Sequence, residues 1–359
     1  MKTTVEHDID FNKPGDSRWD VTFRWEKDDG SKGSFILPVF VYNHGDGPSV
    51  MLSGGVHGDE YEGPSALLDM IAGDAFKDVA GRLIVAPVMN PPALTNNSRR
   101  SPIDDQDMNR SFPGGLNGSP TDAIAHFAST VLIPEIDFLF DLHAGGHIDL
   151  VPPSIMTLAI EDKDLVQRSI EAIDASGLPV IMLPDVLGQE GMFDAEAMRQ
   201  GKVFGCAELG GGGELTAESF KITQTAVRNL LRYTGSLSGE QESILWRGST
   251  TQRYVRQDAD ELFVETPIAG LFIPERSIGD TVHKGDVVGR IVSTEDSNPK
   301  THTVKASTDG YIYFLSAGGH VEEGREVVAL ARDIGRDALL AYHETELKPS
   351  NRRSFADVD

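Results

Sequence analysis

A histidine and a carboxylate stand close together in residues 54–64 (GGVHGDEYEGP), where an apolar run ends in glycines and a helical pattern begins. His57 and Glu60 are three residues apart, so on a turn that becomes helical they point to the same side. An imidazole and a carboxylate placed in this way can bind one metal ion. The pair alone is weak evidence, because the same spacing also occurs by chance in ordinary loops.

A third ligand is offered by His143, which also stands at the end of an apolar run (FLFDLH) that glycines follow. Two histidines and one glutamate leave one position of a zinc ion open to water, as in catalytic rather than structural zinc sites. The sequence therefore predicts a catalytic metal site made by His57, Glu60 and His143.

The elements that must position these side chains alternate between strand and helix. Strands are expected at residues 50–54, 82–88, 136–142, 154–160, 179–183 and 203–208, helices near 63–73, 121–134, 162–176 and 216–233, and one or two further strands between Trp19 and Val41. Continuous apolar strands with intervening helices indicate an α/β sheet that is covered on both faces. Ligands bind such sheets at the carboxyl ends of strands, which is where His57, His143 and Glu208 fall.

The connection at residues 90–119 has little apolar periodicity and many Pro, Asn, Gly and charged residues. Connections of this length in a compact domain are usually functional or disordered. Arg99, Arg100 and Arg110 stand out here, because a planar guanidinium suits a carboxylate or a developing oxyanion. Asn109 adds an amide donor beside them. An equal alternative is that these arginines are solvated and paired with the neighbouring aspartates.

The predicted secondary structure changes from alternating strands and helices to strands alone after the helix expected at 216–233. Residues 244–335 are glycine-punctuated strands without helical periodicity, and their repeated glycine pattern resembles the two halves of a biotinyl or lipoyl carrier barrel. Lys300 lacks the sequence context of a modifiable carrier lysine, so we expect a rigid, barrel-like β module beside the active site or at an oligomer contact. The predicted domains are a catalytic domain at residues 1–243 and, at 244–359, this all-β module with a polar tail.

Composition limits the partners. The chain has 56 acidic and 32 basic residues and a formal net charge of −24, which disfavours nucleic acid and anionic membranes. Cys206 is the one cysteine, so an intramolecular disulfide is excluded and a reducing compartment is favoured. Residues 1–11 lack the apolar core of a signal peptide, and no apolar run approaches the roughly 20 residues of a membrane helix. We therefore expect a cytoplasmic protein.

Four motifs together resemble the succinylglutamate desuccinylase and aspartoacylase family, the amide-cleaving relatives of zinc carboxypeptidases. In chain order they are GGVHGDEYEGP, SRRSPIDDQDMNRSFPG, FDLHAGG and AELGGGG, and the resemblance covers roughly residues 45–235. It implies a zinc-carboxypeptidase-like mixed sheet, one zinc ion per chain and no organic cofactor. By this resemblance His57, Glu60 and His143 match the zinc ligands.

The same resemblance implies roles for other side chains. Glu208 matches the catalytic glutamate that activates water and then protonates the leaving amine. Arg99 matches the arginine that polarises the scissile carbonyl, although the adjacent Arg100 carries the same charge and physical reasoning alone does not choose between them. Asn109 and Arg110 match the pair that binds the carboxylate of the substrate.

The expected substrate is a small N-acyl amino acid. Within the family, DMNRSFPGG and AELGGGGELTAE most resemble the branch of N-α-acetyl-L-2,4-diaminobutyrate deacetylases of ectoine degradation. The alternatives are another amidohydrolase of the aspartoacylase or succinylglutamate desuccinylase type, a metallocarboxypeptidase, and a non-catalytic binding protein. Family members that take acidic substrates carry extra positive side chains near the catalytic strand, and here only Arg199 and Lys202 lie just upstream.

Two further questions stay open in the sequence. Asp59, Asp141 and His147 are candidates for orienting the metal ligands, with an equal alternative that they are ordinary loop residues. A homo-oligomer is compatible with the sequence but not indicated by it.

Overall fold

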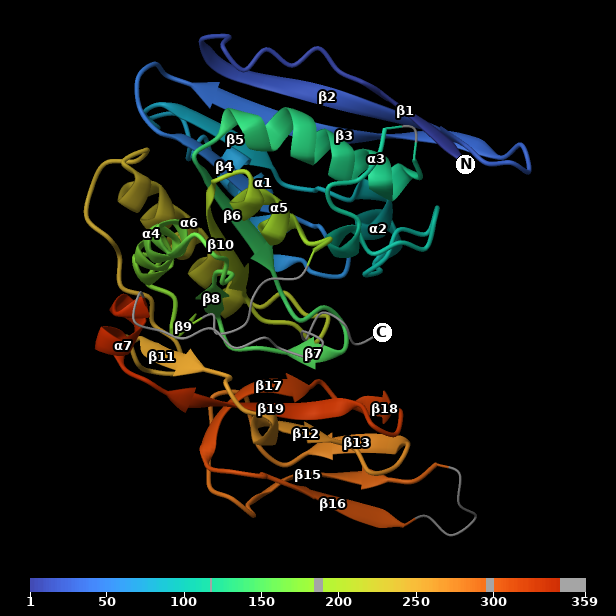
Figure 1. Cartoon of the computed structure of the whole chain (residues 1–359), viewed down its shortest axis with the longest axis vertical. Helices are drawn as coiled ribbons and strands as arrows, with labels where there is room; N and C mark the ends of the chain where they lie inside the picture. Colours follow the sequence, from blue (N-terminus) through green and yellow to red (C-terminus); the bar gives the residue numbers. More distant parts are fainter. Residues whose placement is uncertain (117, 184–189, 295–299, 343–359) are drawn as a thin grey trace.

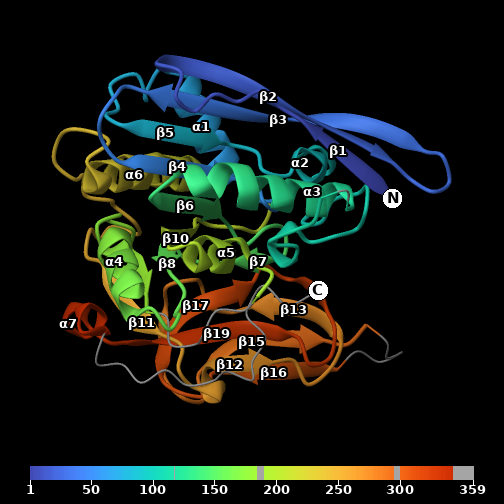
Figure 2. The ribbon, with the colours of Figure 1, turned by 45° about the horizontal axis from the view of Figure 1, so that its top comes forward.

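The computed structural model describes residues 1–116, 118–183, 190–294 and 300–342 (Figure 1). Within these residues fifteen strands form one large mixed sheet and four strands form a second, antiparallel sheet. Figures 1 and 2 show helices around the upper part of the large sheet and strands alone in most of the lower, C-terminal part. The predicted α/β class with a C-terminal β module is confirmed.

The large sheet has a continuous strand order from the N-terminus to the C-terminal module. The order is β1 (Lys2–Glu6), β2 (Gly15–Glu26), β3 (Lys32–Asn43), β5 (Arg82–Ala86), β4 (Ser49–Gly54), β6 (Phe138–His143), β10 (Val203–Glu208), β8 (Ser154–Met156), β9 (Val180–Met182), β11 (Arg253–Arg256), β19 (Glu326–Asp333), β17 (Gly310–Ser316) and β14 (Thr281–Val282). Two short strands join it at the side, with β12 (Phe263–Glu265) on β19 and β7 (Asp149–Leu150) on β17.

The centre of this sheet is parallel, because β5, β4, β6 and β10 all run in one direction. Almost every residue of β4, β5 and β6 is buried, so both faces of these strands are covered, as continuous apolar runs predict. The strands at either side bring antiparallel pairs, β3 on β5 and β8 on β10. The sheet is therefore mixed.

Helices cover the sheet. They are α1 (Glu62–Ala72), α2 (Pro91–Asn96), α3 (Pro120–Phe127), α4 (Lys163–Asp174), α5 (Phe193–Arg199), α6 (Ala217–Thr234) and α7 (Arg336–Leu340). Helix α1 packs on β4, β6 and α6, whereas α4 and α5 pack on β10. None of the helices in the described ranges is long and apolar enough to cross a membrane.

Several predicted elements differ in extent. Helix α3 ends at Phe127 and continues as a π-helical turn (Ala128–Leu132) and a 3₁₀ turn (Ile133–Glu135), where Pro134 has no N–H to continue an α-helix. The strand expected at 154–160 stops at Met156. Connection 90–119 contains α2 and a 3₁₀ turn (Met108–Arg110), and α5 was not predicted.

The C-terminal module has its own apolar core, with buried residues that include Phe272, Val288, Ile312 and Val328. Its second sheet has the order β16 (Thr301–Lys305), β15 (Val287–Val292), β13 (Gly270–Pro274) and β18 (Gly319–Val321), and a 3₁₀ turn (Asp260–Leu262) precedes β12. The polar tail expected at the C-terminus falls mostly on residues 343–359, which lie outside the described residues.

Candidate active site

Three parallel strands bring the predicted site residues to one edge of the sheet. His143 is the last residue of β6 and Glu208 the last residue of β10, and the two are direct partners in the strand register. Strand β4 ends at Gly54 beside Leu142, so His57 and Glu60 follow at the same edge. The turn between them requires a glycine, because a Cβ at Gly58 would lie 2.0 Å from the carbonyl carbon of Ala93.

His57, Glu60 and His143 converge and are all buried. One ligand atom from each lies within 4.8 Å of the others. The Glu60 carboxylate joins them, with Oε1 at 2.7 Å from Nδ1 of His57 and Oε2 at 2.8 Å from Nδ1 of His143. Two imidazole nitrogens and a carboxylate directed at one point are a donor set that fits a zinc ion.

Charge explains how these groups share a buried site. Burial would lower the pKa of His143, but the carboxylates of Asp141 and Glu60 outweigh it and raise that pKa well above its usual value. Burial would raise the pKa of Glu60, and the charges of the two histidines lower it. Each partner therefore favours the charged form of the other.

An aspartate also contacts Nε2 of each histidine, the ring nitrogen that faces away from Glu60. Nε2 of His143 lies 2.7 Å from Oδ2 of Asp141, whose Oδ1 accepts a hydrogen bond from the Ser53 hydroxyl at 2.7 Å. Nε2 of His57 lies 3.1 Å from Oδ1 of Asp107. Carboxylates in this position fix the ring orientation of metal-binding histidines, so Nδ1 of each ring is left to face the site.

The two aspartates differ in how visible they are in the sequence. Asp141 was one of the candidates for orienting a metal ligand, and it precedes His143 by two residues on β6, which places both on one face of the strand. Asp107 is one of the aspartates, with Asp104 and Asp105, that the sequence offered only as partners of solvated arginines. The sequence signal at Asp107 is the Asp107-x-Asn109 spacing, which is typical of an aspartate that caps a turn. The Asp107 carboxylate accepts a hydrogen bond from the Asn109 backbone N–H at 2.8 Å and so caps the 3₁₀ turn.

Arg99 faces the candidate metal site. Nε and Nη2 of Arg99 lie 3.0 and 2.9 Å from Oδ2 of Asp107, and its Nη1 lies 3.3 Å from Nδ1 of His57. Arg100 donates from Nη1 to the carbonyl oxygen of Asp105 in its own loop, at 3.4 Å. The ion pair with Asp107 was also expected of a surface arginine, but here it directs Arg99 toward the candidate metal site, where its Nη1 contacts His57.

Asn109 and Arg110 lie on the 3₁₀ turn beside these groups. Oδ1 of the buried Asn109 accepts a hydrogen bond from the Phe193 N–H at 2.9 Å, which ties the turn to the start of α5. Arg110 donates from Nη1 to the Asn109 carbonyl oxygen at 2.7 Å. The turn therefore fixes where both side chains begin.

Glu208 has the properties of a proton carrier. Burial and the nearby charge of Glu60 raise its pKa to about 7, although the two histidines and Arg99 oppose this. A carboxyl group whose pKa lies near neutrality can both accept and donate a proton at physiological pH. Its position beside His143 in the sheet places it at the edge of the candidate metal site.

The glycine run after Glu208 packs against the loop that follows β6. The Gly212 N–H donates to the Asp149 carbonyl oxygen at 2.9 Å, and a Cβ at Gly211 would lie 2.1 Å from that same oxygen. Asp149 in turn pairs with Arg325 of the C-terminal module at 3.0 Å. The module therefore holds this wall of the site through β7 and the ion pair.

The remaining candidates lie further out. Asp59 accepts from the His147 backbone N–H at 3.1 Å, and the His147 ring contacts the Tyr61 hydroxyl at 3.1 Å, so these contacts join the loop after β4 to the loop after β6. The Arg199 side chain is 68% exposed and pairs with Glu196 at 2.7 Å. Lys202 donates to the Ile136 carbonyl oxygen at 2.7 Å.

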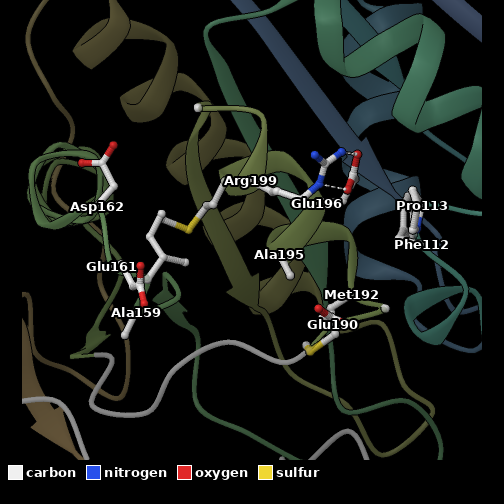
Figure 3. A pocket seen from close by; sticks show the side chains of 14 residues that line it. Phe112, Pro113, Ala159, Glu161, Asp162, Glu190, Met192, Ala195, Glu196 and Arg199 are labelled. Carbon is white, nitrogen blue, oxygen red and sulfur yellow. Dashed lines mark hydrogen bonds and ion pairs between the residues drawn. The ribbon is translucent and has the colours of Figure 1, made fainter.

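A cavity of about 900 Å³ beside α5 is a separate feature. Figure 3 shows Arg199 and Glu196 paired at its edge, with Ala195 and Met192 nearby. Its lining contains neither Glu208 nor any of the three metal-site residues. The cavity is therefore distinct from the candidate active site.

Comparisons with known proteins agree with this geometry. The catalytic-domain profile of the succinylglutamate desuccinylase/aspartoacylase family matches residues 46–234. The chain is 34% identical to a Halomonas elongata protein named N-alpha-acetyl-L-2,4-diaminobutyric acid deacetylase, over 91% of this chain and 94% of that protein.

Solved structures give the same result. The product-bound ectoine utilization protein EutE (DoeB) of Ruegeria pomeroyi superposes with a TM-score of 0.84 at 32% identity, over 91% of this chain and 98% of that one. A succinylglutamate desuccinylase/aspartoacylase of Rhodobacter sphaeroides also gives 0.84, at 30% identity over 92% and 99%. With the profile spanning more than half of its length, the chain belongs to the succinylglutamate desuccinylase/aspartoacylase family.

Proposed function

We propose that the chain is a zinc-dependent deacylase of a small N-acyl amino acid, and that its substrate is N-α-acetyl-L-2,4-diaminobutyrate, in ectoine degradation. The observation that carries the proposal is the convergence of His57, Glu60 and His143 at the strand end where Glu208 also stands. The family assignment gives the coarser statement, a hydrolase of amide bonds. The acetyl group and the amino acid are supported by the name of the Halomonas elongata relative.

The residues divide the chemistry of amide hydrolysis between them. A zinc ion bound by His57, Glu60 and His143 would supply the acidity that makes water a nucleophile at neutral pH and would polarise the amide carbonyl. Glu208 accepts the proton of the attacking water and delivers it to the nitrogen of the leaving amine, for which a pKa of about 7 is suited.

Arg99 is placed to stabilise negative charge on the carbonyl oxygen. Its Nη1 lies 3.9 Å from Oε1 of Glu60 and 3.3 Å from Nδ1 of His57, so the guanidinium reaches the metal ligands. A single donor to a developing oxyanion is typically worth about 3 kcal/mol. The ion pair with Asp107 holds the guanidinium in this direction before substrate arrives.

Asn109 and Arg110 bind the α-carboxylate of the substrate in this proposal. A guanidinium and an amide give charge-assisted hydrogen bonds that fix the amino acid relative to the scissile amide. The hydrogen bond from Phe193 to Asn109 supports this role, because it fixes the turn that carries both residues.

The alternatives fit less well. Aspartoacylase and desuccinylase substrates carry a second carboxylate, but Arg199 is paired and exposed and Lys202 is used by a backbone carbonyl. A carboxypeptidase needs an open groove, whereas the C-terminal module pairs with the loop beside the site through β7.

We also propose that residues 1–243 form the catalytic domain and residues 244–359 the module. We propose the cytoplasm as the compartment of the protein, because a lone cysteine suits a reducing environment.

The test is a panel of N-acyl amino acids with the zinc-loaded protein. We expect the highest kcat/KM for N-α-acetyl-L-2,4-diaminobutyrate, and lower values for N-acetylaspartate, N-succinylglutamate and a peptide with a free C-terminus. A Glu208→Gln variant, measured in parallel, controls for contaminating hydrolase. Turnover of the peptide alone would replace the proposal with a carboxypeptidase.

A further inference from the structure

Asp194 is a buried acid beside the site that the proposed chemistry does not use. It is the second residue of α5 and is 6% exposed. The start of α5 is fixed against the turn that carries Arg110, by the Phe193 hydrogen bond to Asn109 and by the stacking of Phe193 on Phe112 at 4.6 Å between ring centroids. Asp194 therefore lies next to the proposed carboxylate-binding residues.

Helix α5 packs on β10, the strand that ends at Glu208, and the charges of the candidate metal site act on Asp194. Burial raises the pKa of Asp194 to about 6, the charges of His143 and Arg110 lower it, and that of Asp141 raises it. Cys206 lies on β10, and burial is the largest cause that raises the pKa of its thiol. The charges of Glu208, Asp141 and Asp194 raise this pKa further. The Asp194 carboxylate thus belongs to the same electrostatic cluster as Glu208.

Within the described ranges this carboxylate has little compensation. Its hydrogen bond is with the neighbouring Ala195 N–H, which donates to Oδ1 at 2.6 Å. The described residues include no ion pair to it, whereas the next acid of the helix, Glu196, has Arg199. A buried carboxylate without an ion pair is costly, so such groups usually meet a charge from elsewhere.

The chemistry of the substrate supplies that charge. The Cα of an N-acyl amino acid carries three groups, which are the acylamino group, the carboxylate and the side chain. The first two are assigned to the metal ligands with Glu208 and to Arg110. Asp194 stands on a helix that is bonded to the turn carrying Arg110 and packed on the strand that ends at Glu208, so its carboxylate is a candidate to meet the third group, a short side chain that ends in an ammonium group.

Resting on the proposed function, we propose that Asp194 binds the cationic side chain of the substrate and makes the enzyme specific for basic N-acyl amino acids. An acidic side chain would be repelled by the same carboxylate, and the nearby cations that sequence offered for it, Arg199 and Lys202, are engaged elsewhere. Asp194 is in this view a specificity-determining residue of the deacylase.

A structural role is the alternative, because an acid in the first turn of a helix favours the helix. That role requires no burial and no substrate charge. It predicts that removing the carboxylate harms all substrates equally, whereas the specificity role predicts that only the cationic substrate suffers.

The experiment compares N-α-acetyl-L-2,4-diaminobutyrate with N-acetyl-L-norvaline, which replaces the ammonium by a methyl group of similar size. We expect the wild type to prefer the cationic substrate at least ten-fold in kcat/KM, from the strength of a hydrogen bond between charged groups. Asp194→Asn should lose most of that preference and keep its activity on the norvaline derivative. Glu196→Gln, an acid two residues away on the same helix that pairs with Arg199, is the matched control and should keep the preference.

Binding of the free amino acids gives a second readout that does not depend on turnover. Calorimetry with 2,4-diaminobutyrate and norvaline should show tighter binding of the former to wild type and near-equal binding to Asp194→Asn and to Asp194→Ser. If the wild type shows no preference for the cationic compound, or if both variants keep the full preference, the proposal is overturned. It is also overturned if the variants lose turnover on both substrates but keep the preference. If wild type hydrolyses neither derivative, the proposed function fails, and the binding comparison still decides the role of Asp194.

Discussion

Replacing Asp194 by asparagine should stabilise the metal-free protein at alkaline pH. The folded state raises the pKa of this carboxyl from 3.8 to about 6, chiefly through burial. The folded state therefore prefers the protonated form, so the stability that this group contributes is present below pH 3.8 and is lost as pH rises through about 6. The amide of the Asp194→Asn variant is uncharged at every pH and still offers an oxygen to the Ala195 N–H.

The size of the effect follows from the same pKa values. At 1.36 kcal/mol for each factor of ten in the protonation equilibrium, a change from 3.8 to about 6 corresponds to about 3 kcal/mol at pH 8. The same values give about half of that at pH 5, because the group is then largely protonated in the folded state. Asp194→Asn should therefore gain up to about 3 kcal/mol at pH 8 and about half as much at pH 5.

Urea unfolding of the metal-free wild type and variant at both pH values measures this gain, provided that the m-values agree. Asp337→Asn is the matched control, since Asp337 is also the second residue of a short helix but is exposed. That variant should lose about 0.3 to 1 kcal/mol of helix-dipole stabilisation, the opposite sign. If Asp194→Asn is also destabilised at pH 8, the carboxylate is not a buried charge without compensation, and the reasoning fails.

Three further substitutions test the site. Glu208→Gln keeps the size of the side chain but removes the proton carrier, so kcat should fall by about 100-fold or more while bound zinc stays constant, as metal analysis of the same sample would show; surviving activity would mean that another group is the base. Arg110→Lys keeps the charge but loses the planar fork, so its kcat/KM should still be strongly impaired, whereas Arg110→Ala should lose most of the wild-type preference for an N-acetyl amino acid over its carboxamide; equal hydrolysis of acid and carboxamide by the wild type would remove Arg110 from the substrate site. Asp141→Asn removes the carboxylate behind His143, and zinc affinity measured by competition with a chelator should fall by about 10- to 100-fold; an unchanged affinity would show that the contact does not orient the ligand.

The predictable part of the site followed from strand ends and short spacings. His57, Glu60, His143 and Glu208 could be placed together because parallel strands present their carboxyl ends at one edge of a sheet. In the structure Glu208 is the register partner of His143, and His57 and Glu60 converge on His143. Helices with strong apolar spacing, such as α4 and α6, were predicted within a few residues. The mixed character of the sheet was implied only by the family resemblance.

Other parts depend on contacts that a single sequence does not contain. Asp107 stands in a polar connection, and only the folding of that connection onto His57 reveals its contact with the ring. Helix α5 has only seven residues, too few to show a helical period, and Asp194 on it reads as an ordinary helix-start acid until its burial is known. The pairing of β7 with β17 joins residues far apart in the chain, and no local pattern predicts it.

Zinc content measured together with acetate release is the most direct test of the proposed site. Wild type and His143→Ala are each incubated with zinc, freed of unbound metal, and assayed with N-α-acetyl-L-2,4-diaminobutyrate. The account predicts about one zinc per chain and steady acetate release for the wild type, and the loss of most of both for His143→Ala, because two ligands hold the ion poorly. Full zinc occupancy and undiminished acetate release in His143→Ala would contradict it.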